Sequence, residues 1–220
     1  VRRADRQGAR ARRLTTLASL PLLVVGVWAF SEAMHMTSTL GAYGAFLAAL
    51  AIWGWAEKSF HPGAITGPNG AACPPGTSDG DRFWLAWGTI AYHELLLTVL
   101  FGVIWIYGTG ATNTVAISTF TLLYFARISA KLNLYMGVRK INVDFLPGVL
   151  GHLPSHFRIA RLNWLFPISV TALSWTSAIW FDRLIHAATP AEAVGHALLF
   201  AITMLALLEH WLMVLPLPDA

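Results

Sequence analysis

The stretch AYHELLLTVLFGVIWIYG, residues 91–108, decides the fold because it is long and apolar enough to cross a lipid bilayer. Within it the ionisable residues His93 and Glu94 stand side by side. A second adjacent pair, Glu209 and His210, lies in LLFAITMLALLEHWLMVLPLP near the end of the chain. Ionisable side chains at membrane depth are costly unless they pair or bind something. The two pairs are therefore the first candidates for a functional site.

The composition of the whole chain is that of an integral membrane protein. Of its 220 residues 56% are hydrophobic and 12% are charged, whereas a soluble domain carries about 25% charged residues. The net charge of +4 does not indicate nucleic-acid binding, because the basic residues flank apolar runs, as membrane topology requires. A single cysteine, Cys73, excludes an intramolecular disulfide.

Six apolar runs each have about the length needed to cross ~30 Å of hydrocarbon. They predict an all-α, polytopic transmembrane helical bundle that forms one domain, residues 14–220, after a basic arm at residues 1–13. Residues 133–163 are half apolar and interrupted by prolines, so this segment is predicted to lie along the membrane surface. The predicted spans are residues 14–31, 40–58, 84–107, 113–131, 164–185 and 192–215.

Lysine and arginine residues gather in alternate loops, which predicts the orientation of the chain in the cytoplasmic (inner) membrane. One side carries Arg183 alone, and the other side carries all remaining basic residues and both ends of this chain. The basic side is therefore expected in the cytoplasm. Its residues are Arg2, Arg3, Arg6, Arg10, Arg12, Arg13, Lys58, Arg82, Arg127, Lys131, Arg139, Lys140, Arg158 and Arg161.

Basic side chains in the surface segment are expected to serve as a cytoplasmic docking site. Each adds roughly 1 kcal/mol of attraction to anionic headgroups. The predicted docking residues are Asn133, Arg139, Lys140, Arg158 and Arg161.

The pairs His93–Glu94 and Glu209–His210 lie at similar predicted depths in the membrane. At about 1.5 Å per residue, His93 lies ~14 Å and Glu209 and His210 lie ~8–9 Å from the cytoplasmic face. Three further ionisable residues end neighbouring spans at that face: Glu57, Arg127 and Lys131. One interpretation is a structural charge network in which Glu94 or Glu209 neutralises Arg127 or Lys131 and fixes the order of the helices.

Charge pairing does not require histidine, yet histidine occurs in both pairs. Imidazole binds the magnesium of a chlorophyll, haem iron or a bare metal ion. We therefore expect a pigment or metal ligand here, with His210 favoured because Trp211 beside it can stack on a macrocycle. The binding candidates are His93, His210, Glu94, Glu209 and Glu57.

A membrane metalloenzyme acting on a tetrapyrrole or lipid is the alternative. Glu57 and His61, together with the two pairs, supply three carboxylates and three imidazoles, a set that suits a metal centre among helices. Against it, adjacent ligands fit one metal poorly, and Pro62 and Gly63 follow His61. A transporter with a proton relay is a third class, which the absence of evident inverted repeats disfavours.

Five motifs in order resemble the PuhE-type photosynthetic-complex assembly proteins of purple phototrophic bacteria. They are GAYGAFLAALAIWGWAEKSF…TGP, YHELLL, RISAKLNLYMGVRKINVDFLP, NWLFPISV and LEHWLMVLPLP, between residues 41 and 218. The resemblance implies seven helices, one of them before the basic arm, so either this chain starts after that helix or this member lacks it. The residues that match the family motifs are Glu57, His93, Glu94, Arg127, Lys131, Asn133, Asn163, Glu209 and His210.

The resemblance implies an integral membrane factor for assembly of the photosynthetic reaction centre and core antenna. Handling of bacteriochlorophyll or reception of nascent subunits is the expected means. The resemblance names no molecular activity, so whether the protein is an enzyme stays open, with a non-enzymatic role favoured. The cofactor stays open at this point: bacteriochlorophyll or a related tetrapyrrole is the first candidate, ahead of a metal ion. The expected partners are membrane lipids and photosynthetic complex subunits or pigment-synthesis enzymes, without nucleic acid.

Overall fold

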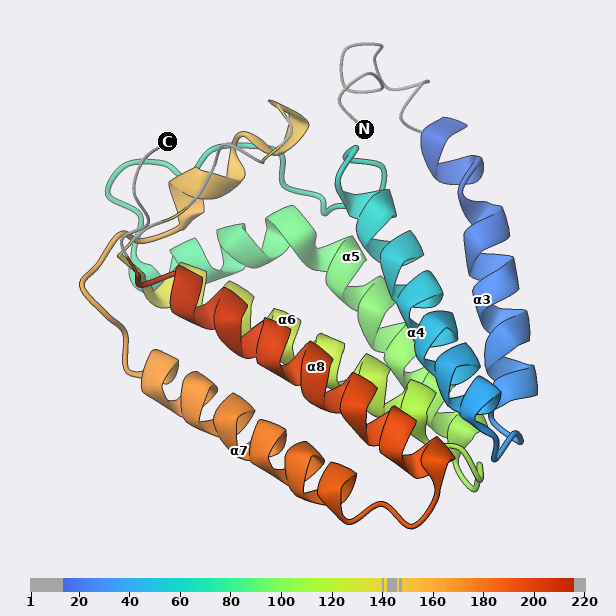
Figure 1. The fold of residues 1–220 in the computed structure, drawn as a ribbon. Coiled ribbons are helices and arrows are strands. Elements are labelled where there is room, and N and C mark those ends of the chain that lie inside the picture. The colour runs from blue at the N-terminus through green and yellow to red at the C-terminus, as the bar shows by residue number, and fades with distance from the viewer. Residues whose placement is uncertain (1–13, 140, 142–145, 147, 216–220) are drawn as a thin grey trace.

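The computed structural model describes residues 14–139, 141, 146 and 148–215 (Figure 1). The predicted basic arm and Lys140 lie outside this part. The described residues are all-helical apart from loops and one isolated bridge between Val138 and Ile159. The elements are α3 (Leu20–Ala33), α4 (Thr39–Phe60), α5 (Asp79–Gly108), α6 (Val115–Met136), η1 (Gly148–Leu150), η2 (Leu153–His156), α7 (Leu165–Ile185) and α8 (Pro190–Leu212).

Five helical segments of the described chain are long and apolar enough to cross a bilayer: Leu14–Ala33, α4, α5, α6 and α8. The predicted sixth span, α7, has 21 residues but is not among them. Hydroxyl side chains recur along it, and Asp182 and Arg183 occupy its last turns. The length and composition of these five segments are consistent with the predicted multi-pass membrane protein.

Local capping explains where the helices depart from the predicted spans. α5 starts at Asp79 rather than at residue 84 because the Ser78 side chain accepts a hydrogen bond from the Asp81 amide. Thr189 caps α8 in the same way, through the Glu192 amide. α6 runs to Met136 rather than to residue 131 and ends at Gly137, whose φ is 123°.

Small residues let α4 pack closely against α3, α6 and α8. A Cβ at Gly26 of α3 would lie 3.0 Å from the Ile52 side chain and 3.2 Å from its backbone nitrogen. The α4 side chains that this packing buries are largely alanines: Ala42, Ala45, Ala48, Ala49 and Ala56.

α5 bends sharply near its middle (Figure 1). The loop before it hydrogen-bonds to the helix backbone: the Asn69 amide and side chain donate to the Gly88 and Leu85 carbonyls at 3.0 Å. The His93 amide in turn donates to the Thr66 carbonyl at 3.0 Å, outside the helix. A group inserted into the helical hydrogen-bond ladder is a standard cause of a kink.

Gly67 allows this insertion. A Cβ there would lie 2.1 Å from the Gly88 carbonyl oxygen, closer than any side chain can sit. The bend also fits the helix to the membrane, because 30 residues would extend for about 45 Å against ~30 Å of hydrocarbon.

Residues 61–78 and the described residues of 137–163 together cover one end of the bundle; we call them the cap (Figure 1). The Cys73 amide donates to the Ser155 hydroxyl at 2.9 Å, and Arg158 pairs with Asp79 at 2.6 Å. Phe60, at the end of α4, packs against Leu150 and Leu153 of the cap.

Candidate functional site

Two ion pairs join three helices beneath the cap. Glu94 of α5 pairs with Lys131 of α6, and Arg127 of α6 pairs with Glu57 of α4 at 2.8 Å. Arg127 and Lys131 are four residues apart and therefore share one face of α6. Glu57 and Glu94 thus each have a basic partner, as the hydrocarbon environment requires of buried acids.

Glu209 does not join these pairs. Its side chain is exposed on α8, although the rise per residue placed it at a comparable depth. Of the two acids expected to neutralise the bases of α6, the structure brings only Glu94 to them, and Glu57 fills the second position.

His93 is fully buried beside these pairs, and its ring packs against Phe60 at 4.6 Å between centroids. Among the described residues neither ring nitrogen has a hydrogen-bond partner. Nδ1 lies 3.6 Å from a Glu94 oxygen, beyond hydrogen-bond distance. His93 therefore has free ligand nitrogens, but they are enclosed by the protein.

His210 is also fully buried, but both of its nitrogens are engaged. Nδ1 lies 2.8 Å from the Ala206 carbonyl oxygen and Nε2 lies 2.9 Å from the Ser129 hydroxyl. A carbonyl only accepts, so Nδ1 carries a proton, and Nε2 shares a hydrogen bond with the Ser129 hydroxyl. Trp211, expected to stack on a macrocycle, instead packs edge-on against Phe166.

The hydrogen bonds of His210 continue across three helices. The Ser129 hydroxyl lies 2.8 Å from the Ser169 hydroxyl of α7, to which Asn133 Nδ2 donates at 2.9 Å. We call Asn133, Ser169, Ser129 and His210 the polar relay. Asn133, predicted as a docking residue, is fully buried in it, so its side chain is not part of the exposed surface.

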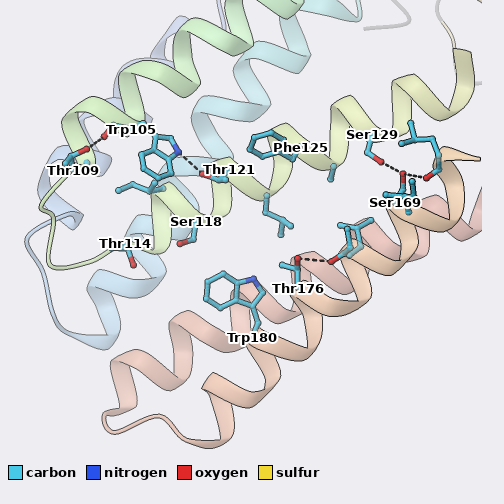
Figure 2. Close-up of a pocket in the computed structure, with 18 of the residues that line it drawn as sticks. Trp105, Thr109, Thr114, Ser118, Thr121, Phe125, Ser129, Ser169, Thr176 and Trp180 are labelled. Carbon is cyan, nitrogen blue, oxygen red and sulfur yellow. Dashed lines mark hydrogen bonds between the residues drawn. The ribbon is translucent and has the colours of Figure 1, made fainter. Parts of the chain in front are cut away.

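A groove of about 740 Å³ opens beside the polar relay, between α6, α7 and the end of α5. Figure 2 shows that α6 and α7 approach each other at Ser129 and Ser169 and separate towards Thr114 and Trp180. Apolar side chains dominate the lining, and two indoles stand in its wider part. The indole of Trp105 is fixed by a 3.1 Å hydrogen bond from Nε1 to the Thr121 hydroxyl.

Sequence reasoning missed this groove. One signal was present, since the lining residues Ser118, Thr121, Phe125 and Ser129 of α6 recur at spacings of three and four and therefore share a helix face. The splay of α6 and α7 that turns this face into a groove depends on the packing of both against α8, which no local pattern reports.

In the described part of the chain, no three His, Cys, Asp or Glu side chains come close enough to hold the metal ion that the alternative interpretation requires. The predicted docking residues of the cap are partly engaged. Arg158 pairs with Asp79 while remaining 48% exposed, and Arg139 donates to the Arg161 carbonyl at 3.1 Å.

Two sequence matches relate the chain to known proteins. A family model described as "Protein of unknown function (DUF3623)" matches residues 1–220. A relative from Rhodobacter capsulatus is described as an uncharacterized 30.4 kDa protein in the puhA 5' region. It is 46% identical over 220 residues, which are 100% of this chain and 80% of the relative. No solved structure matches the chain.

Proposed function

The chain belongs to the DUF3623 family, and on that premise we propose that it is an integral membrane factor for assembly of the photosynthetic reaction centre and core antenna. The location of the relative near puhA, a photosynthesis gene, supports this role. The resemblance of the chain's motifs to PuhE-type assembly proteins agrees with it. The multi-pass helical architecture suits a factor that works within the bilayer.

The groove between α6 and α7 carries the proposal: it holds bacteriochlorophyll in transit. Its volume of about 740 Å³ lies within the range of ligand pockets, roughly 300–1,000 Å³. A flat ring or a hydrocarbon chain suits the space, and entry from the side suits a membrane-dissolved pigment.

The proposed topology has six spans in the cytoplasmic membrane, with α7 as the sixth. α7 packs extensively along α8, and its 21 residues extend for about 32 Å. Arg183 lies at the end of α7 away from the cap, whereas Arg139, Arg158 and Arg161 lie in the cap. The positive-inside rule then puts the cap in the cytoplasm.

The exposed arginines of the cap make it the proposed docking surface for lipid headgroups and for photosynthetic subunits or pigment-synthesis enzymes. The alternative of a metalloenzyme has no support from the described residues, because they bring together no cluster of metal ligands.

A gentle purification from phototrophic cells tests pigment handling. Absorption spectra of the protein should show near-stoichiometric bacteriochlorophyll. Ala172→Phe, which fills the groove, should remove the pigment without lowering the amount of folded protein. The matched control is Ala178→Phe, an exposed position on the same helix that lies outside the groove.

Two outcomes contradict the proposal in different ways. Pigment-free wild-type protein overturns pigment handling. Pigment that survives Ala172→Phe but disappears in His93→Leu moves the binding site to the enclosed imidazole of His93.

A further inference from the structure

The Thr114 hydroxyl, at the exposed N-cap of α6, has no acceptor among the described residues. Three further hydrogen-bond donors in the wider part of the groove also lack one there: the hydroxyls of Ser118 and Thr121 and the indole N–H of Trp180. We call them the donor strip. Figure 2 shows Ser118 and Thr121 on α6 and Trp180 reaching from α7 into the space between the helices.

Hydroxyl groups within a helix usually donate to the carbonyl three or four residues earlier and so satisfy themselves. Thr119 of the same helix does so to Val115 at 2.7 Å, and Thr176 across the groove does so to Ala172 at 2.9 Å. Ser118 forms no such bond within the described chain. Thr121 accepts from Trp105, but its own proton goes to no acceptor there.

Trp180 is held in place by its neighbours. Its ring stacks on His196 at 5.9 Å between centroids, and the Arg183 guanidinium lies 5.2 Å from the ring centroid. Its Nε1 atom is buried and has no hydrogen-bond partner among the described residues. A fixed donor without a partner is expensive at membrane depth, since lipid chains offer no acceptor.

We infer that the donor strip binds carbonyl oxygens of a flat, hydrocarbon-rich ligand. This inference rests on the proposed function and deepens it, because it names the atoms that the pigment presents. A hydrocarbon chain alone leaves all three donors unpaired, whereas ring ketones and esters accept from them. The indole of Trp105 provides a flat wall beside these donors. Tetrapyrrole esters and quinones share this carbonyl chemistry, and the experiment below separates them.

The inference is tested by measuring how tightly three probes bind to the full chain in lipid nanodiscs. Quenching of the protein's tryptophan fluorescence reports the binding of each probe. The first is a metal-free tetrapyrrole methyl ester that carries a ring ketone, and the second is the same compound with the ketone replaced by a methylene group. The third is a short-tailed benzoquinone. Because the tetrapyrroles lack magnesium, an axial imidazole does not contribute to their affinity.

Ser118→Ala and Thr121→Val should each weaken binding of a carbonyl probe about fivefold, the effect of one net hydrogen bond. Their affinity for the ketone-free probe should stay unchanged, which also shows that the groove is intact. The matched control is Thr176→Val, because this hydroxyl lines the same groove but is already satisfied by its own helix. In the infrared spectrum of the bound ketone probe, the frequency of the ketone C=O stretch should be higher in Ser118→Ala than in the wild-type protein, because the oxygen loses a hydrogen bond.

Equal affinity of the wild-type protein for the ketone and ketone-free probes overturns the inference, since the groove is then a site for any apolar molecule. Tighter binding of the quinone, with the same dependence on Ser118, supports the donor strip and identifies a quinone as the source of the carbonyl. Ketone-selective binding by a protein that purifies without pigment also supports the donor strip, and that result counts against the proposed function alone.

Discussion

His210 Nε2 lies 2.9 Å from the Ser129 hydroxyl, and this hydrogen bond joins α8 to α6 at the narrow end of the groove. Because Ser129 also contacts Ser169 of α7, three helices meet at one polar point. Beyond that point α6 and α7 separate (Figure 2). The polar relay therefore sets where the groove ends.

Replacing His210 by leucine should destabilise the bundle. The change leaves the Ser129 hydroxyl with one partner fewer, and an interhelical hydrogen bond in a membrane protein is worth about 1–2 kcal/mol. Unfolding in denaturing detergent should show a loss of that size. Ser129→Ala should produce a similar loss, and the double variant should lose little more. A His210→Leu protein of normal stability that lacks pigment would instead identify His210 as a pigment ligand.

The pair of Glu94 and Lys131 should be strongly coupled. Lys131→Met leaves a buried carboxylate unpaired, which typically costs about 3–5 kcal/mol. Adding Glu94→Gln should restore part of the free energy of unfolding. Asp182→Asn breaks the exposed contact with His186 and serves as the control, with an expected change near zero. Additive effects of the two buried changes would show that Glu94 and Lys131 are not coupled.

Gly67→Ala should disrupt the bend of α5, because the new Cβ collides with the Gly88 carbonyl oxygen. Hydrogen exchange should accelerate at the amides of Asn69 and His93, which bond across this contact. Gly70→Ala is the matched control, since no atom lies within 4 Å of its added Cβ. Unchanged exchange in Gly67→Ala would mean that loop and helix are not held together in the membrane.

Acidification should loosen the cap through His152. Burial, and secondarily the charge of His156, lower the pKa of His152 below its ordinary value of 6.5. The folded cap therefore favours the neutral ring, so its stability is complete above pH 6.5 and falls as the pH drops below that value. Hydrogen exchange of residues 148–157, corrected for intrinsic rates, should be faster at pH 5.5 than at pH 7.5. In His152→Gln the difference in exchange between the two pH values should be smaller. If the wild-type protein and His152→Gln show the same difference, another titratable group causes it.

The orientation is testable with single cysteines in a Cys73→Ser background. Ile159 is 76% exposed in the cap, and Ala188 is exposed in the loop at the opposite end of the bundle. A membrane-impermeant thiol reagent should label Ile159→Cys only from the cytoplasmic side and Ala188→Cys only from the outside. The reverse pattern would invert the topology.

The helices could be predicted from the sequence because long apolar runs are a local property. Their ends could be refined only through capping contacts such as Ser78 with Asp81. The partners of the ionisable residues could not be derived in the same way. Rise per residue gives depth, but the direction of a side chain around the helix depends on how neighbouring helices pack. Glu94 and Glu209 show the difference, since one is buried against Lys131 and the other is exposed.

The roles of the two histidines diverge for the same reason. His210 finds two partners because α6 and α8 present Ser129 and the Ala206 carbonyl to its nitrogens. His93 finds none because Phe60 covers its ring and α5 bends at that point. The bend itself arises from a contact between a loop and a helix, so periodicity within α5 gives no sign of it.

The insertion of Thr66–Asn69 into α5 has a consequence for biosynthesis. This loop directly precedes α5 in the chain, so both partners of the bend leave the ribosome together and need only a short loop closure. The contacts that close the cap, from Ser155 to Cys73 and from Arg158 to Asp79, join residues about 80 positions apart. They form only after α6 has been integrated. The hydrogen bonds of the bend need neither α7 nor α8, so the bend can form while the nascent chain still lacks both helices and can serve as a platform for their packing.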